Sequence, residues 1–286
     1  MQSRLNHHYS TQIEWFRTYF NHTVDRKGME DIHQLRVFIK RIRTVLSLTQ
    51  IVSDEVFNKK PHFQLFLPLF QIAGVLREIH MNEALLHEVG SDRIPQYRDF
   101  LDNSKGSATA DLLAEMAEFD FSALEILNVP LLEKMNALPN QKVAEQTVAY
   151  LTGKLDKVAS PINMLNDNQK VHKIRIHLQN VRATLRLMHD LNPSAEIEKI
   201  QRDTTLLTDL IGRWHDIAVF LEALDKYAAS SDGEKVEDLL ENVIDQFSKE
   251  KESTQVEIGD SLKRYLAEDR KKPLLTWAES PHFVKD

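Results

Sequence analysis

Two segments of this chain carry the same pattern of polar residues, and the pattern has the spacing of an α-helix. The first segment places a histidine and three cations at intervals of three, four and three residues: His33, Arg36, Lys40 and Arg43. The second segment repeats these intervals 139 residues later: His172, Arg175, Gln179 and Arg182. At about 100° per residue, the four positions of each segment fall within about 80° of arc, so each set forms a stripe on one helix face. We expect the two stripes to line one groove for an anion.

A second pair of motifs lies downstream of the stripes and repeats at nearly the same separation. The first motif contains Gly74, Arg77 and Glu78. The second motif, 138 residues further on, contains Gly212, His215 and Asp216. Because both pairs of motifs keep their separation to within one residue, an internal duplication explains them better than coincidence. We therefore predict a first repeat at 1–139 and a second repeat at 140–286.

Helical periodicity extends over most of the chain. Apolar residues recur at intervals of three and four, and no stretch alternates with β-branched residues in the manner of a strand. Besides the two stripe helices, helices are expected near 13–28, 61–89, 93–103, 108–118, 121–138, 141–159, 195–229, 234–251 and 255–271. The fold class is therefore predicted to be all-α, with each half forming an antiparallel helical bundle. Trp214 is expected in the core, and the tail around Trp277 is expected to pack on its own bundle.

Composition and charge exclude several classes of protein. The chain has no cysteine, so it has no disulfide, no thiolate nucleophile and no Cys-based metal site. The net charge of −7 argues against a general nucleic-acid binder. Charge is nevertheless segregated, because residues 30–47 carry +2, residues 170–190 carry +4 and residues 222–260 carry −8. No apolar run suits a membrane span and no signal peptide opens the chain, so we expect a cytoplasmic protein without a membrane partner.

At its motifs the chain resembles the conserved histidine α-helical domain family, abbreviated CHAD. The first family signature is H-x-x-R-(V/I)-x-x-(K/R)-(K/R)-x-R, matched by His33, Arg36, Val37, Lys40, Arg41 and Arg43. The second signature resembles L-G-x-x-(R/H/N)-D-x-x-V, matched by Gly212, His215, Asp216 and Val219, with Ile211 in the Leu position. The chain departs from the family pattern at Gln179 and Asn180, where basic residues are expected, and at Glu78, which replaces an Asp.

The resemblance implies both an architecture and a function. The architecture is a pair of pseudo-symmetric, duplicated four-helix bundles around a central basic groove. The function is the binding of inorganic polyphosphate or a related phosphorylated polyanion, without catalysis and without a cofactor, in keeping with an association with polyphosphate granules. The predicted ligand contacts are His33, Arg36, Lys40, Arg43, His172, Arg175 and Arg182. Second choices are Arg186, which returns to the stripe, and the motif residues Arg77 and His215.

Elementary chemistry supports an anionic ligand for these side chains. Arginine holds phosphate oxygens through paired N–H donors, and lysine holds them as a point charge. Histidine donates more strongly when protonated, so affinity is expected to rise below about pH 6.5. Affinity is also expected to fall steeply with salt, as it does for nucleic-acid backbones. Arg41 lies about 80° from His33 on the side away from the stripe and is expected at the surface or in an ion pair.

Two alternatives compete with polyanion binding. An enzyme or a metal site is disfavoured, because His215 and Asp216 are successive helical residues that point about 100° apart, and because the stripe surrounds its histidine with cations. We therefore predict no catalytic residue and no metal ligand. The alternative function is a helical interaction scaffold with weakened or lost polyanion binding, which meets a basic protein partner through the acidic region 222–260. No specific nucleic-acid partner is expected.

Overall fold

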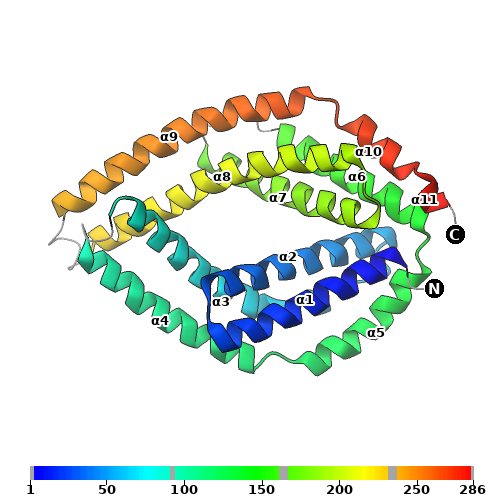
Figure 1. Cartoon of the computed structure of the whole chain (residues 1–286), viewed down its shortest axis with the longest axis horizontal. Coiled ribbons are helices and arrows are strands. Elements are labelled where there is room, and N and C mark those ends of the chain that lie inside the picture. Colours follow the sequence, from blue (N-terminus) through cyan, green and yellow to red (C-terminus); the bar gives the residue numbers. More distant parts are fainter. Residues whose placement is uncertain (1–2, 91–93, 161–166, 231–236, 285–286) are drawn as a thin grey trace.

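The computed structural model describes residues 3–90, 94–160, 167–230 and 237–284. Within these ranges the chain forms eleven helices and no strand, which confirms the all-α prediction (Figure 1). The helices are α1 (Arg4–Arg26), α2 (Met29–Val52), α3 (Lys60–Glu88), α4 (Pro95–Ala117), α5 (Phe121–Ala137), α6 (Asn140–Ala159), α7 (Asn168–Leu191), α8 (Ala195–Ala228), α9 (Glu237–Ala267), α10 (Lys271–Ala278) and α11 (Pro281–Val284). None of the helices described combines the length and apolar character needed to cross a membrane.

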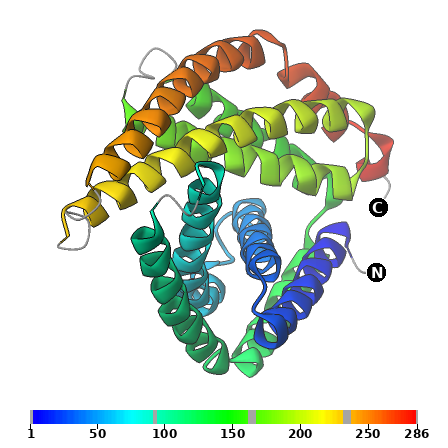
Figure 2. The ribbon, with the colours of Figure 1, turned by 60° about the vertical axis from the view of Figure 1, so that its left-hand side comes forward.

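The first half of the chain builds a fan of helices. Helix α1 packs along α2, α2 packs along α3 and α3 packs along α4, while α5 lies against α1 and α3 (Figure 2). Ser3 caps α1, because its hydroxyl accepts a hydrogen bond from the Asn6 backbone N–H at 3.1 Å. His62 Nε2 contacts the Leu127 carbonyl oxygen at 2.9 Å and thereby ties α3 to α5. These contacts fix α2 and α3, which carry the first stripe and the first glycine motif.

The second half repeats this order of packing. Helix α6 packs along α7, α7 packs along α8 and α8 packs along α9, with α10 and α11 on α6. Trp277 on α10 is 3% exposed, and its indole Nε1 donates to the Asn192 carbonyl oxygen at 2.8 Å. The tail therefore packs on its own bundle, as the sequence predicted. Trp214 on α8 is 2% exposed and belongs to the core, also as predicted.

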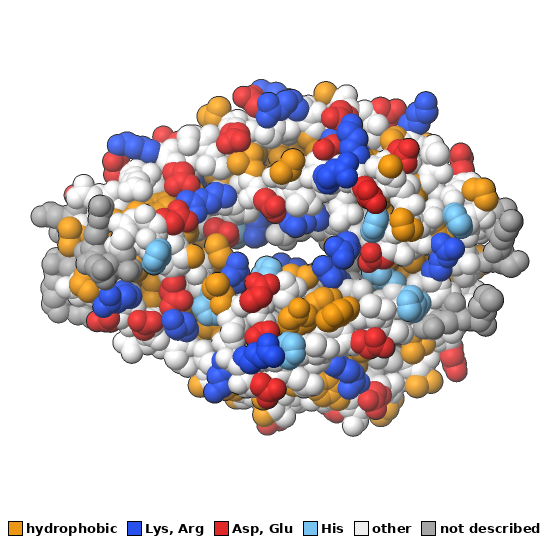
Figure 3. All heavy atoms as spheres, in the orientation of Figure 1, with side chains coloured by type: hydrophobic (Ala, Val, Ile, Leu, Met, Phe, Trp, Pro, Cys, Tyr) orange, Lys and Arg blue, Asp and Glu red, His pale blue; other side chains and the backbone are white. Residues whose placement is uncertain are grey.

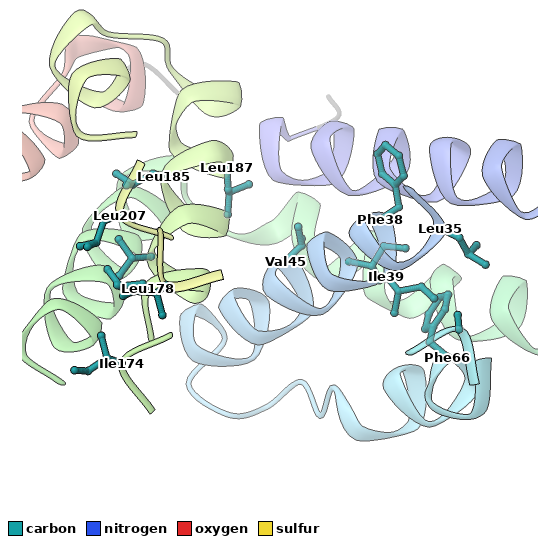
Figure 4. Close-up of a cluster of buried hydrophobic side chains, with 14 of the residues drawn as sticks. Leu35, Phe38, Ile39, Val45, Phe66, Ile174, Leu178, Leu185, Leu187 and Leu207 are labelled. Carbon is teal, nitrogen blue, oxygen red and sulfur yellow. The ribbon is translucent and has the colours of Figure 1, made fainter. Parts of the chain in front are cut away.

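The hydrophobic core is continuous between the two halves. Helix α2 packs against both α6 and α7, and α3 packs against α8. Figure 4 shows one group of buried side chains on α2 and α3 and another on α7 and α8, with Val45 and Leu187 lying between them. The chain passes from one half to the other at Leu138 and Pro139, between α5 and α6. The division into duplicated repeats at 1–139 and 140–286 stays a prediction.

Two predicted helix breaks are wrong. The pieces expected at 93–103 and 108–118 are one helix, α4, and those expected at 234–251 and 255–271 are one helix, α9, followed by α10. Hydroxyl side chains near both expected breaks bond to the preceding turn of the continuous helix: Thr109 donates to the Lys105 carbonyl at 2.7 Å, and Thr254 donates to the Glu250 carbonyl at 2.8 Å. The expected helix starts at 93 and 234 lie outside the described residues.

Candidate anion-binding groove

A basic groove runs through the centre of the molecule. The repeated stripes lie on α2 and α7, and the glycine motifs lie on α3 and α8, so each half contributes one stripe helix and one motif helix. Figure 3 shows the molecule hollowed at its centre, with Lys and Arg side chains bordering the opening. The local cause is the amphipathic character of the stripe helices, because α2 and α7 bury their apolar faces and leave the stripes on the opposite sides.

Arg36 is held against the backbone of α3. Its Nη1 donates to the Phe70 carbonyl oxygen at 2.5 Å, and its guanidinium carbon lies 4.3 Å from the centroid of the Phe70 ring. A Cβ atom on Gly74 would lie 2.6 Å from Arg36 Nη1, so this close approach requires glycine. Burial lowers the pKa of Arg36 to about 10, with Glu78 opposing the shift. Gly74, the glycine of the first repeated motif, therefore leaves the space that the Arg36 guanidinium occupies.

Cations from both halves of the chain meet beside Arg36. Burial, together with the positive charges of Arg36, Arg175 and Arg77, lowers the pKa of Lys40 to about 8. Lys40 is exposed to solvent in the groove, but the helices on both sides remove much of the water around its ammonium group. Arg36, Lys40, Arg77 and Arg175 thus form a central cluster that joins α2 and α3 to α7.

The three predicted histidines border the central cluster. The rings of His172 and His215 lie 5.4 Å apart. Burial, together with Arg175 and His172, lowers the pKa of His215 to about 4. Burial, followed by the charge of Arg77, also lowers the pKa of His33. In the unliganded protein His33 and His215 are therefore neutral at pH 7. Because these two histidines become protonated only below their lowered pKa values, the gain in affinity that their protonation gives is expected at a lower pH than about 6.5.

Arg182 and Arg186 lie apart from the central cluster. Arg182 Nη1 bonds Asp209 Oδ1 at 2.9 Å, and Arg186 Nε lies 3.7 Å from Asp190 Oδ1. Both arginines surround Arg41, whose pKa is lowered by burial and then by Arg186. Arg41 is half-buried and stacks over the ring of Phe38 at 4.8 Å. The sequence predicted Arg41 at the surface or in an ion pair, and the tertiary structure places it near two predicted ligand contacts, Arg182 and Arg186.

A second group of basic residues, which includes Arg43, lies at one end of the groove. Arg43 sits over the Phe63 ring at 4.7 Å. Its positive charge, with those of Lys157 and Lys59, reinforces the lowering of the Lys154 pKa that burial causes. Burial also lowers the pKa of His177, and Lys154 and Lys157 lower it further. Sequence reasoning missed these lysines because they lie outside the stripes, although Lys154 and Lys157 are spaced to share a face of α6.

The groove cations share one property, which is the lack of a described carboxylate within ion-pair distance, although Glu78 and Asp216 lie near the central cluster. Among the residues that the structure describes, no carboxylate oxygen lies within 4.0 Å of the side-chain nitrogens of Arg36, Lys40, Arg43, Lys59, Arg77, Lys154, Lys157 or Arg175. Arg175 Nε is moreover buried with no hydrogen-bond partner in the described part of the chain. Elsewhere arginines are paired, as Arg213 is with Glu88 and Glu250 at 2.7 Å. Unpaired cations in a desolvated groove are unfavourable for the free protein and favourable for an anionic ligand.

Metal binding finds no support in the described ranges. No group of three or more His, Asp or Glu side chains there is arranged to hold a metal ion. Asp216 beside the central cluster has its pKa raised by burial, against the opposing charges of Arg175 and Arg77. The groove therefore offers donors and positive charge rather than ligands for a cation.

Comparison with known proteins agrees with these observations. The sequence model of the CHAD domain matches residues 149–284. No curated protein matches the chain. Among solved structures, the CHAD domain from the plant Ricinus communis is similar with a TM-score of 0.72 and 17% sequence identity, covering 91% of this chain and 90% of that chain. The low identity means that this likeness shows a shared fold. The CHAD domain model therefore matches the second half of the chain, and a solved CHAD domain shares the fold of nearly the whole chain.

Proposed function

We propose that this protein binds inorganic polyphosphate, or a related phosphorylated polyanion, in the central groove without cleaving it. The observation that carries the proposal is the convergence of four cations that have no described carboxylate within 4.0 Å, from two regions of sequence roughly a hundred residues apart: Arg36, Lys40, Arg77 and Arg175. Keeping these charges together costs the free protein stability. A ligand with one negative charge per repeat unit would offset their mutual repulsion.

Each cation supplies a different contact. Arg175 offers its buried Nε, which has no partner among the described residues, and the rest of its guanidinium to phosphate oxygens as paired donors. Lys40 contributes a point charge that becomes fully protonated when an anion approaches. Arg36 keeps one N–H on the Phe70 carbonyl and presents its remaining donors in a fixed orientation. The basic end around Arg43 and Lys154 extends the same charge along the groove.

Binding without bond cleavage follows from the arrangement of the polar residues on α8. His215 and Asp216 are adjacent on one helix and point about 100° apart, so they do not form an acid–base pair aimed at one phosphate. The lowered pKa of His215, about 4, leaves it neutral near pH 7. The groove is thus suited to holding a chain of phosphates rather than to activating a nucleophile.

Calorimetric titration with medium-chain polyphosphate at two salt concentrations tests the proposal. We expect micromolar or tighter binding that weakens as salt rises, because each phosphate contact displaces a counterion. The double variant Arg36→Ala, Arg175→Ala should abolish the binding. The matched control is Lys226→Ala, Lys249→Ala, which removes the same charge from exposed lysines paired with Glu222 and Asp245.

The control variant should keep wild-type affinity. Equal losses in the two double variants would mean that net charge, rather than the groove, determines binding. No binding at low salt would overturn the proposal and favour the scaffold alternative, in which the acidic region 222–260 meets a basic protein partner.

A further inference from the structure

A cavity opens beside the groove and is not explained by binding of a simple phosphate chain. It has a volume of about 760 Å³ and lies between α7, α8 and α9. His172 and His215 line it together with Trp214, Lys173 and Lys251. Because these two histidines also border the central cluster through Arg175, the cavity and the groove are neighbours that share a wall. Its volume is typical of sites that enclose a small organic molecule.

One wall of the cavity is apolar and includes Trp214. Trp214 is 2% exposed, and its indole Nε1 has no hydrogen-bond partner among the residues that the structure describes. Ala218, Val219 and Ile244 line the cavity beside it. A buried N–H group without an acceptor costs free energy, so a ligand atom that accepts from Trp214 would remove this cost. An apolar wall with one donor suits a flat heterocycle better than a phosphate.

The charges of the cavity differ from those of the groove. Glu222 and Asp225 line the cavity alongside Lys173 and Lys251. Carboxylates repel phosphate oxygens and accept hydrogen bonds from amino groups. Lys251 Nζ lies 5.8 Å from the centroid of the Trp214 ring. The mixed polarity indicates a neutral group with both donors and acceptors, whereas the cations of the adjoining groove indicate phosphates.

We infer that the groove and the cavity together take a nucleoside 5′-polyphosphate, with the base and sugar in the cavity and the phosphates on Arg175 and the central cluster. The inference rests on the proposed function, because it uses the groove as the phosphate site. It adds a preference for ligands that carry a base and a sugar over a phosphate chain without them. His172 and His215 lie where the sugar meets the first phosphate, and Arg175 receives the phosphates beyond them.

Calorimetric titration with ATP and with inorganic tripolyphosphate, both free of divalent ions, tests the inference. The two probes have the same number of phosphates, and tripolyphosphate carries more negative charge. Charge alone therefore favours tripolyphosphate, whereas the cavity favours ATP. We expect ATP to bind about tenfold tighter than tripolyphosphate, which is the scale of one or two added hydrogen bonds with apolar burial.

Two variants locate the preference in the cavity. Trp214→Phe keeps an aromatic ring and removes the indole N–H, so it should weaken ATP binding about fivefold and leave tripolyphosphate binding within about twofold. Ala218→Phe fills the cavity from a partly exposed position and should abolish the preference for ATP. The matched control is Trp277→Phe, which removes another buried indole outside the cavity lining and should keep the preference.

The outcomes separate the two proposals. Equal affinities for ATP and tripolyphosphate, or an ATP preference that survives Ala218→Phe, would overturn the nucleotide inference while leaving polyphosphate binding in place. Failure of long polyphosphate, tripolyphosphate and ATP alike to bind would overturn the proposed function itself. If Trp214→Phe does not fold, Ala218→Phe decides the inference alone.

Discussion

Arg36 on α2 and Arg175 on α7 hold the same place in the two repeated stripes, but their surroundings differ. Arg36 donates to the Phe70 carbonyl oxygen at 2.5 Å and stacks on the Phe70 ring, in a space that Gly74 leaves open. Arg175 has a buried Nε without a partner in the described part of the chain. Gly212 is the motif glycine of the second half. A Cβ atom added there would meet no described neighbouring atom within 4 Å, so no arginine side chain packs against Gly212 as Arg36 packs against Gly74.

One sequence pattern therefore serves two physical roles. The first-half arginine is fixed to its own bundle before any ligand arrives, so part of its hydrogen-bonding capacity is used by the fold. The second-half arginine keeps its donors for a ligand and is unfavourable in the free protein. A ligand in the groove gains most from the second half, although that half carries Gln179 in place of a stripe cation.

The largest expected effect comes from Arg175→Ala. Loss of a charge-assisted contact is worth about 2 kcal/mol of binding free energy, which is about a thirtyfold loss of polyphosphate affinity. The free energy of unfolding should stay constant or rise, because the variant removes a half-buried cation whose burial lowers its pKa more than the charge of Asp216 raises it. Calorimetry measures the affinity, and urea unfolding measures the stability.

Arg36→Ala is the matched variant for this comparison. It should lower affinity as well, and it should also destabilise the protein by about 1 kcal/mol, because the Phe70 hydrogen bond and ring contact are lost. Equal changes of stability in the two arginine variants would contradict the division of roles.

The next effect is a pH dependence set by Lys40. Its pKa is lowered from 10.5 to about 8, and the protonated form binds anions, so affinity should be highest below about pH 8 and fall severalfold as the pH rises to about 9. Titrations from about pH 6 to about pH 9 measure this. Lys40→Met should flatten the profile.

The same pKa shift has a consequence for the free protein. Because folding lowers the pKa of Lys40, the protonated side chain disfavours the folded state below about pH 8, and this penalty disappears as the pH rises from about 8 to 10.5. Lys40→Met should therefore raise the melting temperature at neutral pH while weakening binding. A lower melting temperature would show that Lys40 supports the fold.

A smaller effect distinguishes the two motif glycines. Gly74→Ala should push the Arg36 guanidinium away from Phe70, because the new Cβ would lie 2.6 Å from Nη1, and should reduce affinity about threefold. Gly212→Ala meets no described neighbouring atom and should stabilise α8 by about 1 kcal/mol without changing affinity. Calorimetry and thermal melts on both variants measure this. An affinity loss of the same size in both would remove the distinction.

The smallest effect is expected from Arg182→Ala. Arg182 is paired with Asp209 at 2.9 Å and lies with Arg41 rather than with the central cluster, so its removal should change polyphosphate affinity by less than about twofold. The same titration measures it, with Arg175→Ala as reference. A loss as large as that of Arg175→Ala would extend the ligand path to Arg41, and would restore Arg182 to the role that its place in the stripe predicted.

Sequence reasoning succeeded where a local pattern decides the outcome. The stripe positions lie on α2 and α7 because a period of 3.6 residues fixes which side chains share a helix face. It failed near Gly106 and near Ser253, where the expected helices left gaps and the structure has the continuous helices α4 and α9. Packing keeps both helices continuous, and nearby hydroxyls bond to the preceding turn. Propensity is a weak signal when tertiary contacts hold a helix.

The all-α class, the two basic helix faces and the lack of cysteine chemistry follow from the amino-acid sequence alone, because each depends on composition or on residues within a few turns of one another. Which cations meet depends on how the helices pack. The rotation and crossing of α2, α3, α7 and α8 place Arg36, Lys40, Arg77 and Arg175 together and direct Arg182 toward Asp209 and Arg41. Charge interactions depend on the distance between the charges in space and on the exclusion of water, and the spacing of residues along the chain predicts neither.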